Sequence, residues 1–91
     1  MIKEKNMKSF TYTIKDKTGI HARPAGFLNK LVKEFKSETT IEKDGRKVSA
    51  SKLMMLMGLG VKYGDVVTVC VEGEDEDEAS EKIEAFFREN L

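Results

Sequence analysis

A chain of 91 residues is long enough for one hydrophobic core and too short for two, so a single domain is expected. Its formal net charge of zero argues against a dedicated nucleic-acid-binding protein, and its single cysteine, Cys70, excludes an internal disulfide and favours a reducing compartment. Because no apolar stretch is long enough to cross a bilayer and residues 1–6 contain no hydrophobic signal region, we expect a cytoplasmic protein without membrane insertion.

The N-terminal part of the chain predicts a short extension followed by one strand. Residues 1–7 are expected to form a flexible extension, and residues 8–91 a single domain. At the start of that domain, apolar residues occupy every second position, which is typical of a strand with one buried face. The residues in this pattern are Phe10, Tyr12 and Ile14.

The next segment predicts an amphipathic helix from Ala22 to Lys36. Pro24 is compatible with this helix, because the N–H that proline lacks would have no partner in a first turn. Apolar residues then recur at helical spacing, and the buried face would consist of Ala25, Leu28, Leu31, Val32 and Phe35.

The middle of the chain predicts a hairpin and a short helix. Asp44-Gly45 is a pair favoured in type I′ turns. It separates two runs expected to pair as antiparallel strands, residues 39–42 and 46–50. The methionine-rich stretch 51–59 is too apolar for a loop, and a short helix capped by Ser49 or Ser51 fits it best. One or two of its apolar side chains are expected at the surface, where flexible methionines suit several partners; core packing is the equal alternative.

The C-terminal part predicts an interior strand and a final helix. The strand, Val66 to Val71, is apolar on both faces. Five carboxylates, Glu74 to Glu78, would open the helix, where negative charge complements the helix dipole; a solvated helix start is therefore favoured over a metal site. The order strand, helix, strand, strand, short helix, strand, helix predicts an α+β open-faced sandwich. The buried face of the last helix would consist of Ala79, Ile83, Phe86 and Phe87.

The segment around His21 is the candidate functional site. His21 is the only histidine, and it lies at or just before the predicted helix start. The first N–H groups of a helix lack intrahelical partners, and the positive end of the helix dipole attracts anions, phosphate above all. Arg23 adds a planar fork of donors that suits phosphoryl oxygens. Because an imidazole is a nucleophile, the combination predicts transient phosphorylation of His21.

Other chemistries have less support in the sequence. A metal site would need further His or Cys ligands, and the chain has one of each. Neither the nucleophile elbow of a serine hydrolase nor a glycine-rich nucleotide-binding loop is present. We therefore predict neither metal nor cofactor. A lone histidine is more often an ordinary surface residue, and that alternative stays open on composition alone.

Charge is unevenly distributed along the chain. Residues 1–52 contain 13 Lys and Arg and 6 Asp and Glu, a net charge of +7, whereas residues 53–91 contain 3 and 10, a net charge of −7. If the basic residues gather around His21, that face would favour acidic or phosphorylated protein partners.

The sequence resembles one known family, on motifs that cover it from about Lys8 to the C-terminus. The motifs are Gly19-Ile20-His21-Ala22-Arg23-Pro24-Ala25, Val48-Ser49-Ala50, Leu59-Gly60 and Glu72-Gly73-Glu74-Asp75-Glu76. The family is that of the histidine-containing phosphocarrier protein HPr of the bacterial phosphoenolpyruvate-dependent sugar phosphotransferase system. The resemblance implies an open-faced sandwich in which three helices cover one face of a four-stranded antiparallel sheet of order 1-4-2-3.

The resemblance also implies a role for each site residue. His21 would accept a phosphoryl group on Nδ1 from phosphorylated enzyme I and pass it to sugar-specific IIA components. The Arg23 guanidinium and the backbone N–H groups of Ala22 and Arg23 would hold the phosphoryl oxygens. The protein would be a carrier with a transient phosphohistidine rather than an enzyme. A hydrophobic docking patch on the short helix would consist of Leu53, Met54 and Met57.

One position departs from the family pattern. Many Gram-positive members carry a regulatory serine at the start of the short helix, in the order Lys-Ser, whereas this chain has Ser51-Lys52. Lys52 cannot be phosphorylated as a serine can, so we expect serine-based regulation to be absent or altered.

An alternative function within the same fold is regulation. Such a protein would bind a transcription factor or a metabolic enzyme through the short-helix patch. The presence of both His21 and Arg23 argues against it, since a binding protein needs no phosphoryl acceptor.

Overall fold

The alternation of apolar and polar residues produces one antiparallel sheet in the computed structural model, which describes residues 7–91. Its strands are β1 (Met7–Thr13), β2 (Glu38–Lys43), β3 (Arg46–Ser49) and β4 (Val66–Glu72). They lie in the order β1-β4-β2-β3 that the resemblance implied. β4 pairs with both β1 and β2 and is therefore the interior strand predicted from its composition. Its fully buried side chains are Val67, Val69 and Val71.

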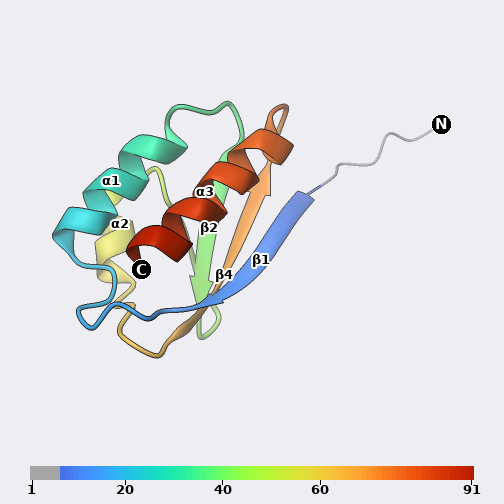
Figure 1. Cartoon of the computed structure of the whole chain (residues 1–91). Helices are drawn as coiled ribbons and strands as arrows, with labels where there is room; N and C mark the ends of the chain where they lie inside the picture. The colour runs from blue at the N-terminus through green and yellow to red at the C-terminus, as the bar shows by residue number, and fades with distance from the viewer. Residues whose placement is uncertain (1–6) are drawn as a thin grey trace.

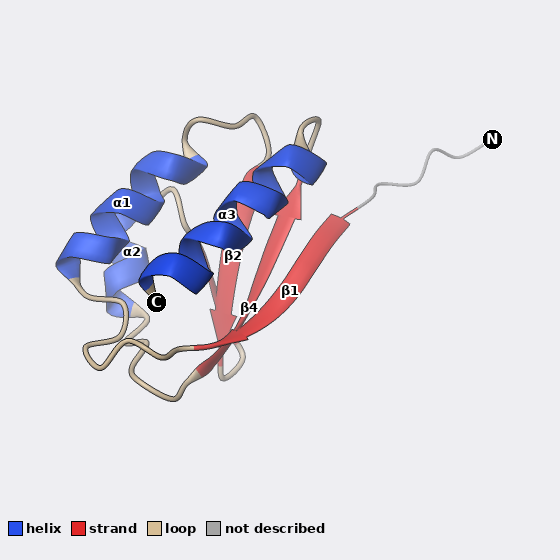
Figure 2. Ribbon diagram, viewed as in Figure 1, coloured by secondary structure: helices blue, strands red, loops and turns tan. Residues whose placement is uncertain are grey.

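Three helices cover one face of this sheet, as Figures 1 and 2 show. They are α1 (Ala22–Val32), α2 (Leu53–Gly58) and α3 (Glu76–Asn90). The core lies between the helices and the sheet, and Phe87 of α3 is the largest side chain that is fully buried. Its ring makes edge-to-face contacts with Phe10 and Tyr12 of β1, at centroid distances of 5.7 and 5.5 Å. The predicted α+β open-faced sandwich is confirmed.

One residue of the predicted extension lies in the sheet. Met7 belongs to β1, because it pairs with Glu72 of β4. The rest of the predicted extension, residues 1–6, lies outside the described residues. Among residues 7–91, no helix is long and apolar enough to cross a membrane.

The hairpin forms where Asp44-Gly45 predicted it. β2 and β3 pair up to Lys43 and Arg46, which leaves Asp44 and Gly45 as the two turn residues. Both have positive φ, 52° and 83°, as a type I′ turn requires.

α1 ends at Val32, four residues before the predicted end at Lys36. In a continued helix the N–H groups of Lys36 and Ser37 would donate to carbonyls four residues back. Here they donate instead to the Asp75 carboxylate, each at 2.9 Å, and the Ser37 hydroxyl donates to it at 2.6 Å. These hydrogen bonds, that of the Ser37 hydroxyl first, lower the pKa of Asp75. The N–H groups of Glu34 and Phe35 already donate three residues back, to Leu31 and Val32, and the contact with Asp75 then holds the segment that follows the helix.

The acidic run opens α3 as expected, with Glu76, Asp77 and Glu78 in the first turn, but it is not solvated throughout. The helix begins at Glu76, with Asp75 as its N-cap residue, so Glu74 and Asp75 lie outside it. Glu76 is buried, and its Oε1 accepts a hydrogen bond from the N–H of Gly73 at 3.0 Å. Two of the five carboxylates therefore hold the chain in place through specific hydrogen bonds.

Candidate functional site

His21 is the N-cap residue of α1, as the Pro24 motif predicted. Its backbone is extended, with φ −105° and ψ −173°, and its carbonyl accepts the N–H of Ala25 at 2.9 Å. The imidazole makes no capping hydrogen bond and is only half-buried. The ring is therefore available to react with a group that approaches from solvent.

The first turn of α1 presents two backbone donors, the N–H groups of Ala22 and Arg23. Neither has a hydrogen-bond acceptor among residues 7–91, Pro24 has no N–H, and Ala25 is the first to bond within the helix. Such donors, at the positive end of the helix dipole, stabilise an anion beside them. The backbone thus leaves two donors without an acceptor among the described residues, at the positions where the sequence predicted phosphate-binding groups; that role stays a prediction.

The turn that precedes His21 requires glycine. Gly19 has a φ of +71°, and a Cβ built on it would lie 2.3 Å from the carbonyl oxygen of Val61. This close approach accompanies a hydrogen bond from the N–H of Ile20 to the same carbonyl, at 3.1 Å. The loop that follows α2 and the turn before His21 are therefore held together backbone to backbone.

The last residue of the described chain also supports the site. The carbonyl oxygen of Leu91 accepts hydrogen bonds from the N–H groups of Lys15 and Asp16, at 2.5 and 2.7 Å, and the Leu91 side chain is buried. The last described residue thus contacts the loop that precedes His21.

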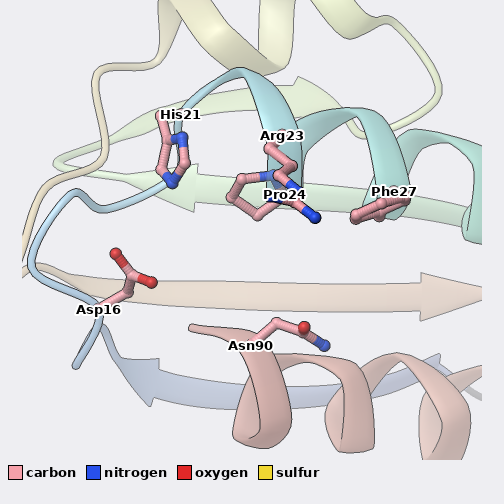
Figure 3. A pocket seen from close by; sticks show the side chains of 6 residues that line it. All are labelled: Asp16, His21, Arg23, Pro24, Phe27 and Asn90. Atoms are coloured by element: carbon pink, nitrogen blue, oxygen red, sulfur yellow. The ribbon is translucent and has the colours of Figure 1, made fainter.

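His21 and Arg23 line one pocket of about 250 Å³. The other residues that line it are Asp16, Pro24, Phe27 and Asn90. Figure 3 shows the Arg23 side chain extending beside Pro24 toward Phe27, away from the imidazole. Among residues 7–91 the guanidinium makes no hydrogen bond or ion pair. The structure thus places the two predicted residues on one pocket but does not bring their functional groups into contact.

Asp16 is a site residue that the sequence analysis placed only in a loop. Its carboxylate faces His21 in Figure 3. The Thr18 N–H and hydroxyl both donate to its Oδ1, each at 2.8 Å. These hydrogen bonds lower the pKa of Asp16, and the nearby positive charge of protonated His21 lowers it further. The sequence Asp16-Lys17-Thr18 is typical of a turn closed by the aspartate side chain. No local pattern, however, shows that the carboxylate faces His21.

The predicted docking patch is exposed on α2. Met54 is 81% exposed, and Leu53 and Met57 are each 37% exposed, whereas Leu56 is fully buried and joins α2 to the core. Met55, absent from the prediction, is 52% exposed. Four apolar side chains reach the surface, more than the one or two expected, because a six-residue helix turns only one side chain of this run fully into the core.

The docking patch lies close to the start of α1. α2 lies beside the first turns of α1 in Figure 1. A hydrogen bond from Asn29 Nδ2 of α1 to the carbonyl of Ala50, at 3.1 Å, ties α1 to the segment that leads into α2. A protein that covers the patch can therefore also reach His21.

The start of α2 differs from the predicted serine cap. Lys52 is the N-cap residue, and it makes no side-chain capping bond. The hydroxyls of Ser49 and Ser51 pair with each other at 2.8 Å instead. The altered serine regulation expected from Lys52 stays a prediction. In the part of the chain that the structure describes, no group of three or more His, Cys, Asp or Glu side chains is placed to hold a metal ion.

Comparison with known proteins gives one family. The model of the family described as "PTS HPr component phosphorylation site" matches residues 8–89. The HPr-like protein Crh of Bacillus subtilis is 45% identical over 75 residues, which cover 82% of this chain and 88% of the relative. The phosphocarrier protein HPr of Borreliella burgdorferi is 44% identical over 77 residues, which cover 80% of this chain and 90% of the relative.

Solved structures give the same result. A phosphocarrier protein HPr from Bacillus anthracis has a TM-score of 0.83 at 33% identity, with 89% of this chain and 96% of that chain covered. A histidine-containing phosphocarrier protein from a mycoplasma has a TM-score of 0.87 at 32% identity, covering 90% of this chain and 93% of that chain. Crh from Bacillus subtilis has a TM-score of 0.74 at 40% identity, covering 100% of this chain and 98% of that chain.

Proposed function

Because the chain belongs to the HPr family, we propose that it is a phosphocarrier in which His21 takes a phosphoryl group from phosphorylated enzyme I and passes it to sugar-specific IIA proteins. The observation that carries this proposal is the His21 position itself. Its imidazole makes no capping hydrogen bond and is accessible to solvent. It lies beside two backbone N–H groups that have no acceptor among the described residues.

The transfer needs a nucleophile and a place for phosphoryl oxygens. The lone pair of the His21 Nδ1 attacks phosphorus, and the new N–P bond forms while the N–P bond of the donor phosphohistidine breaks. The donor imidazole leaves with the electron pair of that bond. Backbone donors of Ala22 and Arg23 then take phosphoryl oxygens, with the guanidinium turning from its position near Phe27 to join them.

An exposed site suits a carrier better than an enclosed one. A carrier has to stabilise the phosphoryl group enough to accept it but not so much that onward transfer is slow. A few donors at a helix start, open to solvent, meet both requirements. On this proposal the chain is consumed and regenerated as a co-substrate, and it is not an enzyme in its own right.

Partner proteins would complete the site. We propose that enzyme I and IIA proteins dock on Leu53, Met54 and Met57, with the exposed Met55 at the edge of the same surface. Docking would exclude water from His21 and strengthen the electrostatic contacts made there.

The test of the acceptor step uses the intact protein with phosphoenolpyruvate and a bacterial enzyme I. Mass spectrometry should detect an acid-labile adduct of about 80 Da. His21→Ala should abolish it, whereas Cys70→Ser, on the strand face away from the helices, should retain it. A protein that stays unmodified under conditions where a known HPr is phosphorylated would contradict the proposal.

A regulatory role is the second candidate. It is favoured by the similarity to Crh, one structure of which is described as the Bacillus subtilis catabolite repression HPr. Capture of a transcription factor or metabolic enzyme that survives His21→Ala but is lost in Met54→Ala would support it. Loss of capture in both variants would instead tie binding to the phosphorylation site.

A further inference from the structure

The Asp16 carboxylate lies opposite the part of the His21 ring that is not used for phosphoryl transfer. In Figure 3 the far end of the imidazole, where Nε2 lies, points toward Asp16, and the other ring nitrogen lies nearer the start of α1. Both side chains line the same pocket. Among the described residues, the only other charged side chain that lines it, Arg23, points away from the ring.

The carboxylate is held in this position by its own turn. Thr18 donates two hydrogen bonds to Oδ1, each 2.8 Å long, and the backbone N–H of Asp16 itself donates to Leu91. Oδ2 has no hydrogen-bond partner among residues 7–91. One carboxylate oxygen is therefore hydrogen-bonded within the turn, and the other has no partner within residues 7–91 and lies beside the histidine.

We propose that Asp16 is a positioning residue for phosphoryl transfer, which keeps the Nε2 proton on His21 and leaves the Nδ1 lone pair free to attack phosphorus. This inference rests on the proposed phosphocarrier function. A carboxylate can only accept a hydrogen bond, so an imidazole that faces it is favoured with the proton on Nε2. The opposite tautomer carries the proton on Nδ1 and cannot react there.

The same carboxylate stabilises the charge that the transfer creates. When a neutral imidazole bonds to phosphorus through Nδ1, the ring becomes a cation and the proton stays on Nε2. Asp16 supplies a negative charge to this end of the ring, while the backbone N–H groups of α1 face the phosphoryl group at the other end. On transfer to the next protein, the cationic ring leaves as a neutral imidazole with the Nε2 proton retained.

Asp16→Asn removes the negative charge of the side chain but keeps its shape. Its amide oxygen can keep both hydrogen bonds from Thr18, but the amide NH2 then faces Nε2 as a donor and favours the Nδ1–H tautomer. Nitrogen NMR of unphosphorylated His21 should show the Nε2–H tautomer in the wild-type protein and a shift toward Nδ1–H in the variant. Phosphorylation by enzyme I should have a kcat at least about tenfold lower with little change in KM.

A matched variant separates the positioning role from a general effect of the substitution. Asp44→Asn makes the same substitution in the β2–β3 turn, and it should keep the wild-type tautomer and stay within about twofold of the wild-type kcat. Thr18→Val keeps the carboxylate but removes one of the two hydrogen bonds that hold it, so its loss should be smaller than that of Asp16→Asn. The inference is overturned if Asp16→Asn keeps the wild-type tautomer and kcat, or if Asp44→Asn reproduces the whole loss. The tautomer needs no phosphoryl donor, so it tests Asp16 even if the wild-type protein proves not to be phosphorylated.

Discussion

The Arg23 side chain makes no contact that stabilises the described part of the fold, so its proposed role in phosphoryl transfer can be tested separately from stability. It is exposed and unpaired within residues 7–91. A hydrogen bond to a charged group is worth about 1.5–3 kcal/mol, so Arg23→Ala should slow phosphoryl transfer by about 10- to 100-fold. Arg23→Lys should recover only part of the loss, because lysine keeps the charge but lacks the planar fork. Thermal melts should be unchanged in both. A wild-type transfer rate for Arg23→Ala would remove the guanidinium from the mechanism.

The position of His21 at the start of α1 could be predicted from sequence, and its surroundings only in part. His21 and the helix-start donors follow from a local motif, since helix capping depends on a few adjacent residues. The direction of the Asp16 carboxylate depends on hydrogen bonds that Thr18 donates to it and on one that the Asp16 N–H donates to Leu91, which is 75 residues away in sequence. Local patterns carry no information about such a contact.

The turn before α1 can be tested with a matched pair of glycines. Gly19 and Gly60 have nearly the same φ, 71° and 72°, but only at Gly19 would a Cβ meet a neighbouring backbone. Gly60→Ala should cost about 1 kcal/mol for the left-handed backbone alone, and Gly19→Ala about 2–4 kcal/mol, because the contact with Val61 adds to it. Urea denaturation measures both costs. Equal costs would show that the close approach to Val61 does not constrain the site.

The junction between α1 and α3 should make stability depend on pH. Hydrogen bonds to the Asp75 carboxylate lower its pKa below the ordinary value of 3.8, and the pKa values of Asp65 and Asp16 are lowered in the same way. A lowered carboxylate pKa stabilises the fold above the ordinary value and loses that contribution as pH falls through the folded-state pKa. Unfolding free energy should therefore fall steadily below about pH 3.8.

Asp75→Asn provides the control for this pH dependence. The asparagine side chain lacks the charge, so the variant should be less stable than the wild-type protein at neutral pH and the difference should narrow in acid. A constant difference between about pH 7 and about pH 2 would show that the Asp75 charge has no part in holding Lys36 and Ser37.

Elements whose signals are local could be predicted, and those set by distant contacts could not. Three elements formed as expected: the Asp44-Gly45 hairpin, the interior strand and the start of α1. Each is determined by turn residues or a hydrophobic period that involves only a few adjacent positions. The course of the chain after α1 is held by Asp75, 39 residues beyond Lys36, and this contact could not be seen in the helical pattern. The family resemblance, rather than periodicity, supplied the strand order.

The two oppositely charged parts of the chain fold against each other. Within residues 7–91, three ion pairs join basic residues of the first part to acidic residues of the second: Lys8–Asp77, Lys36–Glu74 and Lys43–Asp65, at 3.2, 3.4 and 3.1 Å. Part of the positive charge is therefore used within the fold. Among residues 7–91, Arg23 is the only basic side chain besides His21 that lines the His21 pocket. The basic face around His21 stays a prediction.

The central claim is that the molecule both accepts and passes on phosphoryl groups, and turnover tests it directly. A small amount of the protein is mixed with excess phosphoenolpyruvate, enzyme I and a IIA protein, and pyruvate release is measured against the amount of this protein. A carrier should support many pyruvate molecules per chain, with the IIA protein becoming phosphorylated and His21→Ala inactive. Release that stops at about one pyruvate per chain, with the IIA protein unmodified, would contradict the carrier function.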